Sequence, residues 1–312
     1  MKINGIKFDL EMTKLFNEVK VLLGDRELRI NFVDELLDEE TLQIGGGAYA
    51  KKCSDGNWEI LVCKDDSCLD YTLSHELLHV FLDEKGFPNI FHTNKDICCE
   101  LSANIGTLIS NVVLHKIIIT EQAIRGFNVV DAPRKKLQDV VTTWQILPKL
   151  SDQTLGYVLA VVSFFIEGAG VLSDYEDDIK NKNPFLYQPA KLLYDSLCEK
   201  PYTTPFETRR ALVKTFKKMD ELLISYDSKP LKLHEKLIVK YIPSKRQLSL
   251  KVSNVFNAYT NVNDDLLITA QSDEQLCFLY ENGSGGSLKD ELKDMTVEAF
   301  LTWAYKDFTV RE

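Results

Sequence analysis

The stretch "SHELLHVF", residues 74–81, decides how this chain is interpreted. It places His75 and His79 four positions apart, and Glu76 directly follows the first histidine. On a helix, residues four apart project from one face one turn apart, so both imidazoles can reach the same ion while Glu76 lies beside it. The pattern therefore predicts a helix that holds a metal ion next to a carboxylate.

This geometry suits zinc. Two histidines leave Zn²⁺ short of ligands, so we expect a third protein ligand and one position kept for water. Glu76 would then take a proton from that water, whose pKa the metal lowers. The same five-residue motif also arises by chance on amphipathic helices, and the third ligand therefore decides between the two interpretations.

Glu100 is the preferred third ligand. It follows His79 by 21 residues and opens the helical pattern "ELSANIGTLIS", whose small residues would allow a second helix to approach the first. Asn104 lies one turn further on the same face, where its side-chain oxygen could accept a hydrogen bond from a ligating histidine. Without a metal, Glu100 and Asn104 would form a solvated face. His92, in a proline-containing loop, is a spare candidate for the third ligand.

These residues resemble a known family. "HELLH", the "ELSAN" stretch about twenty residues later and the small sheet expected before them are similar to the gluzincin type of zinc metallopeptidase, and most similar to the ImmA/IrrE peptidase group. The resemblance covers roughly residues 1–118. It implies that His75, His79 and Glu100 bind Zn²⁺ and that Glu76 is the catalytic base.

The resemblance is incomplete in two respects. Thermolysin-like relatives have an aspartate where this chain has Asn104, so an acceptor is kept but a charge is lost. Residues 119–312 match no pattern of the family, and no convincing helix-turn-helix is present. Repressor cleavage, a role of some family members, is therefore only a weak expectation.

The apolar pattern predicts an α+β fold in three regions. A zincin-like unit, residues 1–118, would combine a small β-sheet with the active-site helix and the helix that carries Glu100. Its expected elements are a helix at 8–23, a strand near 28–32, a hairpin at 45–63 turning at "SDGN", and helices at 70–85 and 96–117. The helix at 70–85 would be capped by Asp70 or Thr72.

The remaining two regions are a mainly helical one, residues 119–228, and a small α+β one, residues 229–312. The apolar run "LGYVLAVVSFFI" at 155–166 is closed by Glu167 and is too short to cross a bilayer, so a buried helix is expected. Alternation in the last region predicts strands at 236–242, 247–256 and 266–270, followed by one helix at 287–308.

Composition narrows the function. The 312 residues carry a formal net charge of -10, which works against general affinity for nucleic acid. The opening "MKINGIKFDLEM" has no continuous apolar stretch, so no secretory signal and a cytoplasmic location are expected, without membrane association. The seven cysteines are expected to be reduced thiols. The oligomeric state is not predicted.

Other features could take part in the site. The segment "GGGAYA" at 45–50 lacks the residues of a phosphate-binding loop and is expected to enter an edge strand, to which an extended substrate could add. Tyr71, His92 and Tyr157 are alternative donors to a developing oxyanion. His115, within "VVLHKIII", is expected at a helix edge rather than in catalysis.

The leading functional hypothesis is an intracellular zinc-dependent endopeptidase acting on a protein or peptide substrate, with Glu76 as general base. Two alternatives stay open. One is a protein-binding module that keeps the fold without catalysis, and the other is a metal-dependent hydrolase of a non-peptide bond. An intact Glu76 favours an enzyme, because a structural metal site needs no base.

Overall fold

A computed structural model describes residues 2–3, 6–34, 47–93, 99–135, 138, 154–168, 171–281, 285–305 and 307–311. The described residues form a mixed α+β structure with small sheets, which confirms the predicted fold class at this level. The chain divides into two units, residues 1–85 with 111–198 and residues 86–110 with 199–312. The sequence-based regions were 1–118, 119–228 and 229–312, and the first of their boundaries falls inside the helix α3 (Glu100–Arg125).

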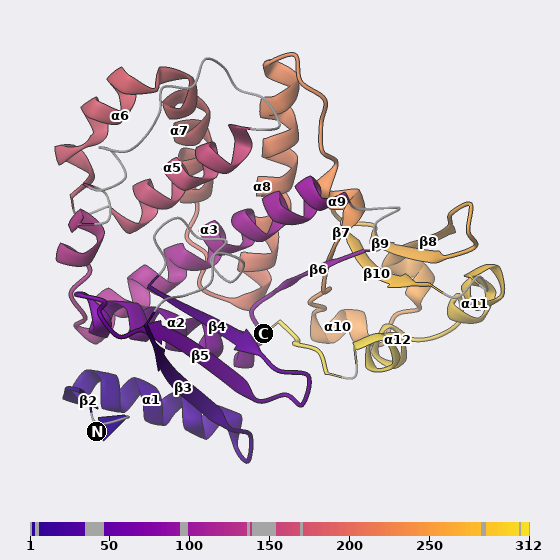
Figure 1. Cartoon of the computed structure of the whole chain (residues 1–312). Coiled ribbons are helices and arrows are strands. Elements are labelled where there is room, and N and C mark those ends of the chain that lie inside the picture. Colours follow the sequence, from indigo (N-terminus) through magenta and orange to yellow (C-terminus); the bar gives the residue numbers. More distant parts are fainter. Residues whose placement is uncertain are drawn as a thin grey trace. The chain divides into compact units, whose positions relative to one another are not determined.

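The first unit contains a three-stranded sheet in the order β3-β5-β4 (Figure 1). Strand β3 (Leu28–Val33) runs parallel to β5 (Trp58–Cys63), and β4 (Ala48–Lys52) runs antiparallel to it. The hairpin predicted at "SDGN" joins β4 to β5, and Gly56 takes a φ of 84° there. Residues 35–46, which include the first two glycines of the "GGGAYA" segment, lie outside the described residues.

Helices α1 (Leu10–Leu23) and α2 (Leu69–Glu84) pack against each other, and α2 also packs against β4 and β5 (Figure 1). Asp9 caps α1 by accepting a hydrogen bond from the Met12 amide at 2.8 Å. The predicted caps of α2 are wrong, because the helix begins before Asp70, at Leu69, and no side chain caps it. A short two-stranded ribbon, β1 (Lys2–Ile3) and β2 (Ile6–Lys7), precedes α1.

The other described elements of the first unit are helical. They include the second half of α3, α5 (Leu155–Glu167), η2 (Leu172–Asp174), α6 (Glu176–Lys182) and α7 (Pro184–Cys198). Helix α5 is the predicted buried helix, and its Phe165 packs edge-on against Tyr187 and Tyr194 of α7. Among the described helices, α3 alone has the length and apolar composition to cross a membrane, and 56% of its apolar window is buried, as in a core helix.

The second unit starts with β6 (Ile90–His92), which pairs antiparallel with β7 (Leu237–Val239). Helix α8 (Pro205–Ser225) begins with a capping box in which Thr204 and Glu207 exchange hydrogen bonds, and the short helix α9 (Leu233–Lys236) follows it. Beyond β7, the strands β8 (Phe256–Thr260), β9 (Leu266–Ala270) and β10 (Leu276–Tyr280) form an antiparallel meander.

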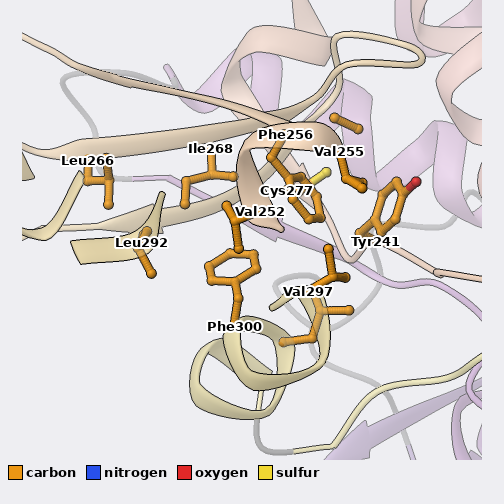
Figure 2. Packing of buried hydrophobic residues seen from close by; sticks show 12 residues of the cluster. Tyr241, Val252, Val255, Phe256, Leu266, Ile268, Cys277, Leu292, Val297 and Phe300 are labelled. Atoms are coloured by element: carbon orange, nitrogen blue, oxygen red, sulfur yellow. The ribbon is translucent and has the colours of Figure 1, made fainter. Parts of the chain in front are cut away.

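The core of this meander is aromatic and aliphatic (Figure 2). Phe300 of α12 (Val297–Tyr305) is fully buried, with its ring centroid 5.4 Å from Phe256 and 5.7 Å from Phe278. Figure 2 shows Phe300 pointing from its helix toward Val252 and Phe256. Leu292, at the end of α11 (Gly285–Leu292), joins the same core.

Two sequence-based predictions for this region are wrong. Residues 247–256 do not form one strand, since α10 (Lys245–Leu248) and η3 (Val252–Asn254) occupy half of them and β8 begins only at Phe256. Ser244 and Gln247 form a capping box, which satisfies the free amides of a helical turn and so favours it over a strand. The single final helix that was predicted is two helices in the structure. In the turn between them, the Thr296 hydroxyl accepts a hydrogen bond from the Ala299 amide in the first turn of α12, and Thr296 forms an isolated antiparallel β-bridge with Lys251.

Candidate metal centre

One face of α2 carries three rings in a row. Tyr71, His75 and His79 follow each other at intervals of four residues, so they project from the same side of the helix. The ring centroids of Tyr71 and His75 are 6.2 Å apart, and those of His75 and His79 are 5.0 Å apart. The sequence prediction that both histidines share one face agrees with this geometry.

His115 of α3 completes the histidine group, which we define as His75, His79 and His115. The Nε2 atoms of His75 and His115 are 3.2 Å apart, and the His115 ring centroid lies 4.5 Å from that of His75 and 5.3 Å from that of His79. One ring nitrogen from each of the three residues lies within 4.8 Å of the other two. This group could hold a metal ion.

Gln122 fixes the register of α3 against α2. It is fully buried, and its side-chain amide donates hydrogen bonds to the Tyr71 carbonyl at 2.8 Å and to the Ser74 hydroxyl at 2.7 Å. Gln122 lies two helical turns beyond His115, so the two side chains project from the same face of α3. The hydrogen bonds of Gln122 thereby fix the rotation of α3 so that His115 faces His75.

A carboxylate holds the other side of the His115 ring. Glu167, the last residue of α5, lies with its Oε1 atom 3.1 Å from His115 Nδ1. Ser163, one turn earlier on α5, donates its hydroxyl to the same oxygen at 2.9 Å. His115 is 4% exposed, so this contact is made in a nearly dry environment.

The spacing between the His75 and His115 nitrogens fits a metal ion. Two nitrogen ligands about 2.05 Å from a tetrahedral zinc ion lie about 3.3 Å apart, and the His75 and His115 Nε2 atoms are 3.2 Å apart. The Nε2 atom of His79 is buried and has no hydrogen-bond partner among the described residues. A buried ring nitrogen left in this state is unfavourable, and a metal ion would satisfy it.

His79 is held in the protonation state that a ligand requires. Burial lowers the pKa of His79 to about 3, and the neighbouring His115 acts in the same direction, while Glu167 opposes them. The imidazole is therefore neutral at physiological pH, and a metal ion binds to the neutral ring. No proton has to be removed from His79 before it can coordinate.

Glu76 is buried on the helix that carries His75 and His79. It follows His75 directly on α2 and is only 6% exposed. Leu73 and Leu77, which flank the histidines on the helix, are fully buried, so the carboxylate lies in a largely apolar region. Burying a carboxylate in an apolar region raises the free energy of the folded state unless a partner compensates it, and Glu76 does have an interaction partner.

The structure does not bring Glu100 and Asn104 into the histidine group. Both are exposed in the first turns of α3, and Glu100 lies 15 positions before His115, about 22 Å along the helix axis. The third histidine of the group is His115, which was expected at a helix edge from the sequence.

Of the three predicted oxyanion donors, Tyr71 lies next to His75 on the same face of α2. It is 4% exposed, and burial raises the pKa of its hydroxyl well above the usual value, so it remains a donor. Tyr157 of α5 is 44% exposed. His92 is exposed on β6 in the second unit, where its Nε2 lies 3.5 Å from the Thr107 hydroxyl.

Comparison with protein-family models, with curated proteins and with solved structures finds no match. The case for a metal centre therefore rests on the positions of these side chains.

Proposed function

We propose that this protein is a zinc-dependent hydrolase of peptide bonds, in which His75, His79 and His115 hold the metal ion and Glu76 is the general base. The observation that carries the proposal is the buried histidine group, whose ring nitrogens lie within 4.8 Å of one another, together with a buried carboxylate that directly follows His75 on α2.

Zinc is favoured by the chemistry of the ligand set. Imidazole nitrogen suits Zn²⁺, whereas Mg²⁺ and Ca²⁺ prefer oxygen ligands. Three protein ligands are typical of catalytic zinc sites, which keep a fourth position for water, while structural sites use four. Copper, iron and nickel also bind imidazole, so the identity of the metal is part of the proposal.

The chain's own residues would divide the work as follows. The zinc ion, when bound, supplies a positive charge that polarises a carbonyl and lowers the pKa of water. Glu76 accepts the proton of the attacking water and delivers it to the leaving amine. Tyr71, whose ring centroid lies 6.2 Å from that of His75, would donate a hydrogen bond from its hydroxyl to the developing oxyanion.

The sheet supports a peptide as substrate. Among the described strands, β4 pairs on one side only, with β5, so its other edge offers backbone amides and carbonyls. An extended peptide can add to such an edge through main-chain hydrogen bonds. Helix α2 packs against β4, which brings the histidine helix next to that edge.

Metal content tests the ligand set. The chain has five histidines, so His92→Ala and His234→Ala are matched controls for His75→Ala and His115→Ala. We expect about one zinc per chain in the wild type and in both controls, and loss of zinc in the other two variants. Glu100→Ala should keep its zinc. Full zinc in His115→Ala together with loss in Glu100→Ala would replace our ligand set by the one the sequence predicted.

A second candidate is a binding protein with a structural metal ion. The observation in its favour is burial, since His75, Glu76 and His115 are 7%, 6% and 4% exposed. Incubating the zinc-loaded wild type with a proteome-derived peptide library separates the two candidates. New peptide termini that are absent with Glu76→Gln support the hydrolase, and none at full zinc loading supports the binding protein.

A further inference from the structure

We propose that Glu167 is a positioning residue, whose carboxylate fixes the His115 ring so that its Nε2 lone pair points into the histidine group. This inference rests on the metal site of the proposed function. It assigns a role to α5, an element that the sequence motif does not include.

The first step is the tautomer of His115. An ionised carboxylate can only accept hydrogen bonds, so the 3.1 Å contact between Glu167 Oε1 and His115 Nδ1 requires that Nδ1 carry the proton. The neutral ring then has its lone pair on Nε2. That atom is the one 3.2 Å from His75 Nε2, in the centre of the group.

The second step concerns how Glu167 itself is held. The hydroxyl of Ser163 donates to the same Oε1 atom at 2.9 Å, which orients the carboxylate toward His115. Ser163 and Glu167 are one turn apart on α5, so the helix presents both groups together. The arrangement gives a chain of three hydrogen-bonding groups that ends at the candidate ligand.

The position of Glu167 on its helix argues against a merely solvated charge. It is the last residue of α5, where the helix dipole disfavours a negative charge, and no basic residue lies in the last turn to offset it. A metal ion bound through His115 would supply that positive charge. The side chain is also only 18% exposed.

The alternative is a purely structural role, in which the hydrogen bond of Glu167 only holds α5 against α3. Such a hydrogen bond would affect the stability of the first unit but would leave the affinity for metal unchanged once the protein is folded. Carboxylates that hold a metal-binding histidine typically change metal affinity 10- to 100-fold when they are replaced. The two roles therefore differ in what they alter.

The test is a zinc titration of the full-length protein against a chromophoric chelator, together with Co²⁺ absorption spectra. Glu167→Gln keeps the size and an accepting oxygen but loses the charge, and Ser163→Ala removes the group that orients the carboxylate. Glu176→Gln is the matched control, because Glu176 accepts a hydrogen bond from Tyr187 at 2.6 Å elsewhere in the same unit.

We expect a zinc affinity about 10- to 100-fold lower in Glu167→Gln, a smaller loss in Ser163→Ala, an altered Co²⁺ spectrum in both, and wild-type behaviour in Glu176→Gln. Wild-type affinity and spectrum in a folded Glu167→Gln protein would overturn the inference. A wild type that binds neither metal would instead overturn the proposed function.

Nuclear magnetic resonance of the histidine side chains tests the hydrogen bond without a metal. In the metal-free wild type, His115 should show the tautomer protonated at Nδ1, and this preference should weaken in Glu167→Ala. An Nε2-protonated His115 in the wild type would contradict the inference whatever the metal experiments show.

Discussion

Acidifying the metal-free protein should destabilise the first unit, and His79 should contribute to the early loss of stability. The groups that face His79 are His75 on its own helix, His115 of α3 and Glu167 of α5. Burial lowers the pKa of His79 to about 3, whereas the unfolded chain has the ordinary value of about 6.5. The unfolded state therefore takes up a proton first as the pH falls.

The sign and the size follow from proton linkage. Because the folded state keeps His79 neutral, stability is highest above pH 6.5 and falls continuously until the folded state itself is protonated near pH 3. Between pH 7.5 and pH 5.5 the expected loss from His79 is about 1.4 kcal/mol. This window lies above the range in which most carboxylates titrate, so His79 can be separated from them.

The assay is hydrogen exchange on peptides of α2 in the presence of a chelator, corrected for the intrinsic effect of pH on exchange. This measurement reports the opening of the first unit rather than of the whole chain. His79→Gln should reduce the loss between the two pH values by about 1.4 kcal/mol, and His234→Gln should leave it as in the wild type. An equal loss in wild type and His79→Gln would refute the assigned burial of His79.

Three further outcomes are expected. Glu76→Gln should lower turnover by at least about a hundredfold while zinc content and melting temperature change little, because general-base assistance is typically worth 10²- to 10⁴-fold. Hydrolysis measured near the wild-type rate would remove Glu76 from the mechanism. Phe300→Ala should cost about 3–5 kcal/mol in the second unit by urea unfolding, whereas the fully exposed Val262→Ala should change stability by less than about 0.5 kcal/mol. Gly86→Ala should lower the melting temperature, since the φ of Gly86 is 77° and an added Cβ would lie 2.0 Å from the Thr309 hydroxyl oxygen; an unchanged value would show that this turn relaxes freely.

Local signals predicted the elements of the first unit well. The turn glycine at Gly56 and the apolar period each act over a few residues, and the helix α1 and the β4–β5 hairpin appear where these signals place them. In the second unit, alternation suggested a strand at residues 247–256. The capping box of Ser244 and Gln247 is also local and favours the helical turn that the structure shows.

Which residue of α3 joins His75 and His79 depends on how two helices pack, and this packing is not a local property of the sequence. The helix expected to carry the third ligand does reach the histidine group, but about four turns further along than Glu100. That distance is set by the register of α3 against α2, which the buried Gln122 fixes through its bonds to Tyr71 and Ser74. Spacing along the chain carries no information about this register.

His115 gave little sign of its position because, apart from Lys116, its neighbours in the run "VVLHKIII" are apolar. A single lysine in this run does not define a polar face that would show which way the imidazole points. Its partner Glu167 is 52 residues away on another helix, at the end of a continuous apolar run. Each residue alone is a polar group in an apolar segment, which is costly to bury unpaired. The cost of burying both residues falls if they pair with each other, and the 3.1 Å contact between His115 Nδ1 and Glu167 Oε1 is that pair.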